Sequence, residues 1–92
     1  MDKANIFKAI VDVTLKKSIL DPQGQTTLHA LETLGFQEAK DLRVGKHFVL
    51  TVNSANAVEA EEKVRQMCEK VLINPVIEEY FVKIEPLGGT SK

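Results

Sequence analysis

The segment from Ile6 to Leu15 alternates between two kinds of side chain, and this pattern constrains the fold more than any other part of the sequence. A period of two predicts a β-strand, because successive side chains of a strand point to opposite faces. The predicted strand is about twice the usual length. One face carries only apolar side chains: Phe7, Ala9, Val11, Val13 and Leu15. The other face is mixed: Ile6, Lys8, Ile10, Asp12, Thr14 and Lys16.

The stretch LDPQG that follows has the features of a helix start. Asp21 is a good N-cap, since its side-chain oxygen can accept a free backbone N–H, and Pro22 suits the first helical position. Gly35 is expected at the C-terminal cap of this helix. A phosphate-binding loop needs several glycines and usually a lysine, whereas this stretch has only Gly24. A loop that contacts a ligand or a partner stays open as the alternative.

The second half of the chain predicts a hairpin, a helix and a last strand. Gly45 and Lys46 lie between KDLRV and HFVLTV, which suggests a two-residue turn within residues 39–50. A second helix is expected after Asn53 or Ser54, with a final strand over residues 76–84. The apolar stripe of that helix is expected to contain Val58, Val64, Met67, Cys68, Val71 and Leu72.

This order of elements predicts an α+β fold of the ferredoxin-like βαββαβ type. Its antiparallel sheet would have four strands, with two helices covering one face. We expect a single domain over residues 1–85 and a flexible C-terminal tail over residues 86–92.

The uncovered face of such a sheet should be mostly polar, but several apolar side chains fall on it. A contiguous apolar patch with a charged rim is typical of an interaction site. Scattered exposed apolar residues are also common, so this simpler interpretation stays open. The predicted self-association face consists of Ile10, Val49, Ile77 and Phe81.

Composition argues against several classes of protein. The net charge of −1 gives no general attraction to nucleic acid or to anionic membranes. No apolar run reaches the length of a membrane span, no signal peptide is expected, and one cysteine fits a reducing compartment. We therefore predict a cytoplasmic protein without a nucleic-acid or membrane partner. Cys68 is expected to be buried, and no spacing of residues indicates a metal site or a catalytic group.

Four segments in order resemble one known family. They are VDVTLKKSILDPQG, LETLGF, DLRVGKHFVL and MCEKVLINPVIEEYFVKI, and they extend from about Val11 to Ile84. They resemble the PurS family, the small subunit of phosphoribosylformylglycinamidine synthase. Each segment alone is weak evidence, but their order and spacing together are specific.

The resemblance implies a role in the fourth step of de novo purine biosynthesis. In that complex a glutaminase subunit releases ammonia, and a large synthetase subunit uses ATP and magnesium. The small subunit would bind no cofactor by itself, would have no catalytic residues, and would form a homodimer or tetramer that joins the other two subunits. We expect its partner interface at Asp21, Pro22, Gln23, Gly24, Arg43, Gly45 and Lys46.

Two other functions stay open. Domains of the ACT type share this predicted fold and bind amino acids near a glycine-bearing turn, for which Gly24 is a candidate. A small independent enzyme is the third possibility, although no group of residues in the sequence supports it.

Overall fold

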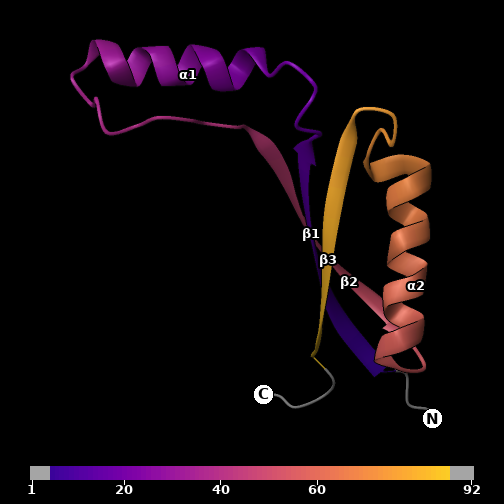
Figure 1. Cartoon of the computed structure of the whole chain (residues 1–92). Coiled ribbons are helices and arrows are strands. Elements are labelled where there is room, and N and C mark those ends of the chain that lie inside the picture. The colour runs from indigo at the N-terminus through magenta and orange to yellow at the C-terminus, as the bar shows by residue number, and fades with distance from the viewer. Residues whose placement is uncertain (1–4, 88–92) are drawn as a thin grey trace.

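The fold is built on a three-stranded antiparallel sheet (Figure 1). The computed structural model describes residues 5–87. Strands β1 (Asn5–Leu15), β2 (Gly45–Ser54) and β3 (Glu78–Pro86) lie in the order β2-β1-β3. The long alternating strand predicted from the sequence is therefore confirmed and occupies the centre of the sheet.

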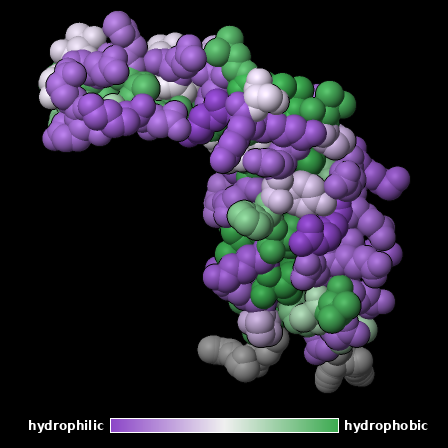
Figure 2. All heavy atoms as spheres, viewed as in Figure 1, coloured by the Kyte–Doolittle hydropathy of each residue, from purple (hydrophilic) through white to green (hydrophobic). Residues whose placement is uncertain are grey.

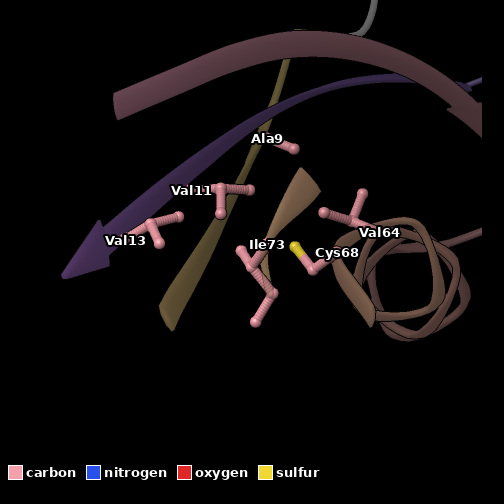
Figure 3. Packing of buried hydrophobic residues seen from close by; sticks show 6 residues of the cluster. All are labelled: Ala9, Val11, Val13, Val64, Cys68 and Ile73. Atoms are coloured by element: carbon pink, nitrogen blue, oxygen red, sulfur yellow. The ribbon is translucent and has the colours of Figure 1, made fainter. Parts of the chain in front are cut away.

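The register of the strands separates a buried face from an open face. Val11 lies opposite Phe48 on β2 and Val82 on β3, so these three side chains share the buried face. The apolar half of β1 is buried there, and Figure 3 shows how its side chains meet those of the helical segment. The core cluster consists of Ala9, Val11, Val13, Val64, Cys68 and Ile73.

Helix α2 (Ala57–Met67) covers the buried face and continues into a π-helical turn, η1 (Cys68–Leu72). The side chain of Asn56 caps α2 by accepting the Glu59 N–H at 2.8 Å. The predicted cap at Asn53 or Ser54 is wrong, because β2 continues through those two residues in its pairing with β1.

The π-helical turn changes which apolar side chains are buried. The Ile73 N–H donates to the Cys68 carbonyl, five residues back, at 3.0 Å. Because a π turn adds one residue to the α-helical spacing, Ile73 enters the core and Val71 points outward, 80% exposed. The predicted stripe is correct for Val64 and Cys68. It is wrong for the exposed Val58, Met67 and Val71.

Helix α1 (Pro22–Thr33) projects away from the sheet (Figure 1). Its predicted boundaries are confirmed: Asp21 is the N-cap, and Gly35 follows the helix with a φ of 98°. The chain returns alongside α1 to β2, and residues 20–44 together are called the arm. Within the described part of the chain, α1 has no packing contact with another helix or strand. The radius of gyration is 17.6 Å, against about 12 Å for a compact chain of this length.

The ferredoxin-like α+β class with an antiparallel sheet is confirmed, but two details differ from the prediction. The sheet has three strands rather than four, and only α2 lies on its face. The predicted hairpin turn at Gly45 and Lys46 is wrong, because Gly45 already pairs with Thr14 of β1. A Cβ atom on Gly45 would lie 2.2 Å from the Val13 carbonyl oxygen, so this close approach explains the glycine.

The C-terminal end of the sheet reaches slightly beyond the predicted domain limit at residue 85. Strand β3 ends at Pro86, and the Leu87 N–H donates to the Ile6 carbonyl at 2.8 Å. The rest of the predicted tail, residues 88–92, lies outside the described residues.

Candidate interaction surfaces

The root of the arm is held by Asp21, which is only 3% exposed. Its carboxylate accepts the Val44 N–H at 2.8 Å and the Gly24 N–H at 3.0 Å. These backbone hydrogen bonds, first that from Val44 and then that from Gly24, lower the pKa of Asp21 below its usual value. One side chain therefore caps α1 and also ties the start of α1 to the segment that returns to β2.

Gly24 lies where the two halves of the arm approach each other. A Cβ atom at this position would lie 2.5 Å from the Leu42 carbonyl oxygen and 2.6 Å from the Asp21 carboxylate. Any larger residue would push the returning segment away from α1. Close packing thus accounts for Gly24 without a phosphate or an amino-acid ligand.

Arg43 makes a second tie at the root of the arm. Its Nη2 donates to the carbonyls of Lys16 at 3.0 Å, Ile19 at 3.2 Å and Leu15 at 3.5 Å. These bonds satisfy carbonyls in the loop between β1 and α1. The guanidinium is therefore used within the chain, and its availability to a partner is smaller than the sequence suggested.

Lys46 pairs with Glu78 across the sheet, with 3.1 Å between Nζ and Oε2. Glu78 also accepts the Asn74 N–H at 2.8 Å, and this bond, followed by the Lys46 contact, lowers the pKa of Glu78. The pair borders a hollow of about 200 Å³ at the root of the arm. Its lining is Val13, Leu15, Asp21, Gln23, Val44, Gly45, Lys46 and Glu78.

The structure brings the residues of the predicted partner interface together at the root of the arm. Their exposure differs, however, since Asp21 and Gly24 are buried whereas the other five are exposed: Pro22, Gln23, Arg43, Gly45 and Lys46. A partner at this site would meet residues from the exposed five, and the buried two would support that surface from below.

The open face of the sheet carries three of the four residues predicted for self-association. Ile10 lies beside Val49, and Phe81 lies in the neighbouring row opposite Asp12. Val49 is 57% exposed and Phe81 is 80% exposed. A His47–Asp12 contact of 2.5 Å borders this group and gives it a polar rim.

Ile77 does not belong to that face. It lies in the turn before β3, where its carbonyl accepts the Lys16 N–H at 2.9 Å. The last strand starts at Glu78, two residues after the predicted start at Val76. The N–H groups of Ile77 and Glu78 both donate to the Asn74 carbonyl, so residues 74–77 form a turn. The self-association face, as used below, therefore means Ile10, Val49 and Phe81.

An apolar groove on the outer side of α2 and η1 was missed by the sequence reasoning. Its volume is about 490 Å³. The sheet with α2 and η1 is called the body below, and Figure 2 shows hydrophobic side chains among hydrophilic ones on both the body and the arm. The one signal for the groove was the spacing of Val64, Cys68 and Ile73, four residues and then five, which departs from an α-helix. The groove is lined by Lys63, Gln66, Met67, Lys70, Val71 and Leu72.

Residues 5–87 show neither a metal-binding cluster nor an activated cysteine. No group of three or more histidine, cysteine or acidic side chains in that range could hold a metal ion. Cys68 is buried, and its burial raises the pKa of the thiol, which disfavours the reactive thiolate. Within the same residues, no helix is long and apolar enough to cross a membrane.

Comparison with known proteins identifies the family. The family model for PurS, described as phosphoribosylformylglycinamidine (FGAM) synthase, matches residues 8–86. The chain belongs to the PurS family. A PurS subunit from Bacillus subtilis is 41% identical over 80 residues, which cover 87% of this chain and 94% of that protein. The subunit from Methanocaldococcus jannaschii is 38% identical, with coverage of 89% and 99%.

Solved PurS structures have the same fold. The PurS subunit of Thermotoga maritima has a TM-score of 0.85 at 36% identity, with 91% of this chain and 97% of that chain covered. A chain in the structure described as PurLQS from Thermotoga maritima has a TM-score of 0.81 at 38% identity, with coverage of 87% and 98%. The family resemblance inferred from the four sequence segments is confirmed.

Proposed function

We propose that this PurS chain is the small, non-catalytic subunit of a phosphoribosylformylglycinamidine synthase complex. It would hold a glutaminase subunit and a large synthetase subunit together, so that ammonia released from glutamine reaches the synthetase. The observation that carries this proposal is the likeness, over most of its length, to the chain in the PurLQS structure. The complex would act in the fourth step of purine biosynthesis.

The shape of the molecule supports an assembly role. The arm projects from the body, and its Leu34 and Phe36 are 74% and 52% exposed. A helix of this length is marginal without packing partners, and an apolar surface in water is costly. Such an arm is therefore suited to contact another chain.

Two surfaces are proposed for these contacts. Pro22, Gln23 and Lys46, supported by Asp21, Gly24, Arg43 and Gly45, would meet one of the larger subunits at the root of the arm. The self-association face would join copies of this chain into a dimer or tetramer. Both assignments rest on exposure and on the chemistry of the side chains.

The cofactors belong to the complex in this proposal. ATP, magnesium and glutamine would bind to the larger subunits, and the small subunit would bind none of them alone. The complex would operate in the cytoplasm, where the nucleotides of purine biosynthesis are made and used.

The test is reconstitution with candidate glutaminase and synthetase subunits, with and without glutamine and magnesium-ADP. Amidation is measured with glutamine and, separately, with ammonia. We expect glutamine-dependent amidation to need this chain, whereas ammonia-dependent amidation should not. Equal glutamine-dependent rates with and without the chain would refute the assembly role.

A thermal-shift measurement addresses the ACT-type alternative. A ligand at about 100 times its Kd stabilises a protein by about 2.7 kcal/mol, which is readily seen. We expect no shift of the isolated chain with amino acids, because the packing of Gly24 under Leu42 already accounts for that glycine.

A further inference from the structure

The end of the body that carries the root of the arm is built from loops that are tied to one another. Figure 1 shows the end of β1, the starts of β2 and β3, and the end of α2 together there. The Lys16 N–H donates to the Ile77 carbonyl at 2.9 Å, which joins the loop after β1 to the turn before β3. Arg43 donates to carbonyls of the first loop, and Lys46 pairs with Glu78 across the sheet. The surface at this end is therefore shaped before a partner binds.

Lysine dominates the charged side chains of these loops. The stretches KKSIL and KVLINPVIE, residues 16–20 and 70–78, contain three lysines and one acidic residue. That acidic residue, Glu78, is already paired with Lys46 and accepts the Asn74 N–H. Within residues 5–87, none of the three lysines forms an ion pair: Lys16, Lys17 and Lys70. The two stretches therefore carry excess positive charge, although the net charge of the chain is −1.

Each of the two stretches also exposes an apolar side chain. Leu20 is 65% exposed and Val76 is 75% exposed. Figure 2 shows hydrophobic side chains on the surface where the arm joins the body. Exposed apolar groups with a charged rim are typical of an interaction site. The basic end, as used below, means Lys16, Lys17, Leu20, Lys70 and Val76.

We propose that the basic end docks an acidic segment of the large synthetase subunit. Carboxylates of that segment lie beside the three lysines, and its apolar side chains cover Leu20 and Val76. The basic end adjoins the exposed Pro22 and Gln23, and together they form a broad surface that suits the larger of the two partners. This inference rests on the proposed function and adds residues that the predicted partner interface did not contain.

A segment of another protein fits this surface better than nucleic acid or a second copy does. Surfaces that bind nucleic acid carry many cations along one face, whereas the basic end has three cations and two apolar side chains. The acidic side chains at the start of α2 in a second copy are already engaged. Glu59 accepts the Ala55 N–H, and Glu61 pairs with Arg65.

Photo-cross-linking in the assembled complex identifies what the basic end contacts. A benzophenone is attached to Val76→Cys or, as the matched control on the open face of the sheet, to Lys83→Cys. Each full chain is mixed with both larger subunits, glutamine and magnesium-ADP. Both sites are exposed and the native Cys68 is fully buried, so the unaltered chain serves as the control for background labelling.

We expect the label at Val76 to cross-link to a synthetase peptide rich in aspartate and glutamate, and the label at Lys83 not to give that product. Four results would each overturn the proposal. They are a cross-link from Val76 to the glutaminase, one to a second copy, one to a synthetase peptide without an acidic excess, and none at all.

Charge reversal tests the chemistry of the contact. Lys17→Glu and Lys70→Glu should each raise the chain concentration needed for half-maximal glutamine-dependent amidation, by about threefold to tenfold at low salt. The effect should shrink as salt is added, because ions screen exposed charges. Lys83→Glu makes the same change of charge outside the basic end and should shift that concentration less than about twofold. Equal shifts for all three variants, or shifts that do not depend on salt, would contradict the proposal.

The docking surface and the proposed function fail in different ways. If glutamine-dependent amidation needs the chain but Val76 gives no cross-link to the synthetase, the assembly function stands and the docking surface is wrong. If the cross-link forms but amidation does not depend on the chain, the docking surface stands and the proposed function is wrong.

Discussion

The body and the arm of this protein are stabilised by different means. The body is held by a core in which Val11, Val64 and Cys68 have no exposed surface. The arm contains only two buried residues, Asp21 and Gly24, and its position depends on hydrogen bonds from Asp21 and Arg43. The body therefore has a core of its own, whereas the arm has almost none and leaves Leu34 and Phe36 exposed. The difference shows how a small subunit can combine a stable unit with a surface for assembly.

Truncation of core side chains should have the largest effect. Val64→Ala should lower the free energy of unfolding by about 2–3 kcal/mol, because it removes buried apolar surface and leaves a cavity. The matched control is Val71→Ala, seven residues later and exposed, with an expected change below about 0.5 kcal/mol. Chemical denaturation of the isolated chain measures both. Equal losses would contradict the structural role of the π-helical turn.

Substitution of one glycine in the body, Gly45, and one in the arm, Gly35, should have smaller effects on the free energy of unfolding. Gly45→Ala should cost about 1–3 kcal/mol, because the new Cβ would overlap the Val13 carbonyl where β2 starts. Gly35→Ala meets no atom within 4 Å, so only its positive φ resists the change, at about 1 kcal/mol.

The same denaturation assay separates the two glycine variants, with Gly35→Asn as a control, because asparagine tolerates that φ. A larger loss for Gly35→Ala than for Gly45→Ala would contradict the close contact between β1 and β2.

Protonation of Asp21 at low pH should loosen the root of the arm. We expect its effect on the free energy of unfolding to be the smallest of those predicted here. The pKa of Asp21 is lowered in the folded state, so its contribution is complete above its usual value of 3.8. That contribution is lost as the pH falls through the lower, folded pKa, because protonation weakens the bonds from Val44 and Gly24.

A titration followed by NMR should show the Val44 and Gly24 amide signals moving together with a midpoint below pH 3.8. Asp21→Asn removes the titrating group and should abolish this transition. Movement of the two amides at different pH values would mean that Asp21 does not join them.

Much of the fold could be predicted from local patterns. The alternation in β1, the capping of α1 by Asp21 and Pro22, and the glycine at the end of α1 depend on residues close in sequence. The family could also be identified, since its segments are read directly from the chain. Of the predicted open face, Ile10, Val49 and Phe81 were placed correctly because strand alternation fixes the face of each residue.

The errors came from features that local patterns do not determine. The start of β2 was misplaced because a glycine beside a lysine is typical of a turn, whereas Gly45 is needed for close approach to β1. The exposed groove beside Val71 was missed because a single π turn shifts the register of a helix, and only the fit to the core selects it.

The sequence by itself determined the location of three strands and two helices, the apolar face of β1, and the family of the protein. These follow from periodicity, caps and residue order within short stretches of chain. Only the tertiary structure decided that residues 39–44 do not fold back on β2, that α1 leaves the sheet, and that Asp21 joins the two halves of the arm. Those outcomes depend on contacts between residues far apart in the chain, and their energies are set by packing that no local pattern records.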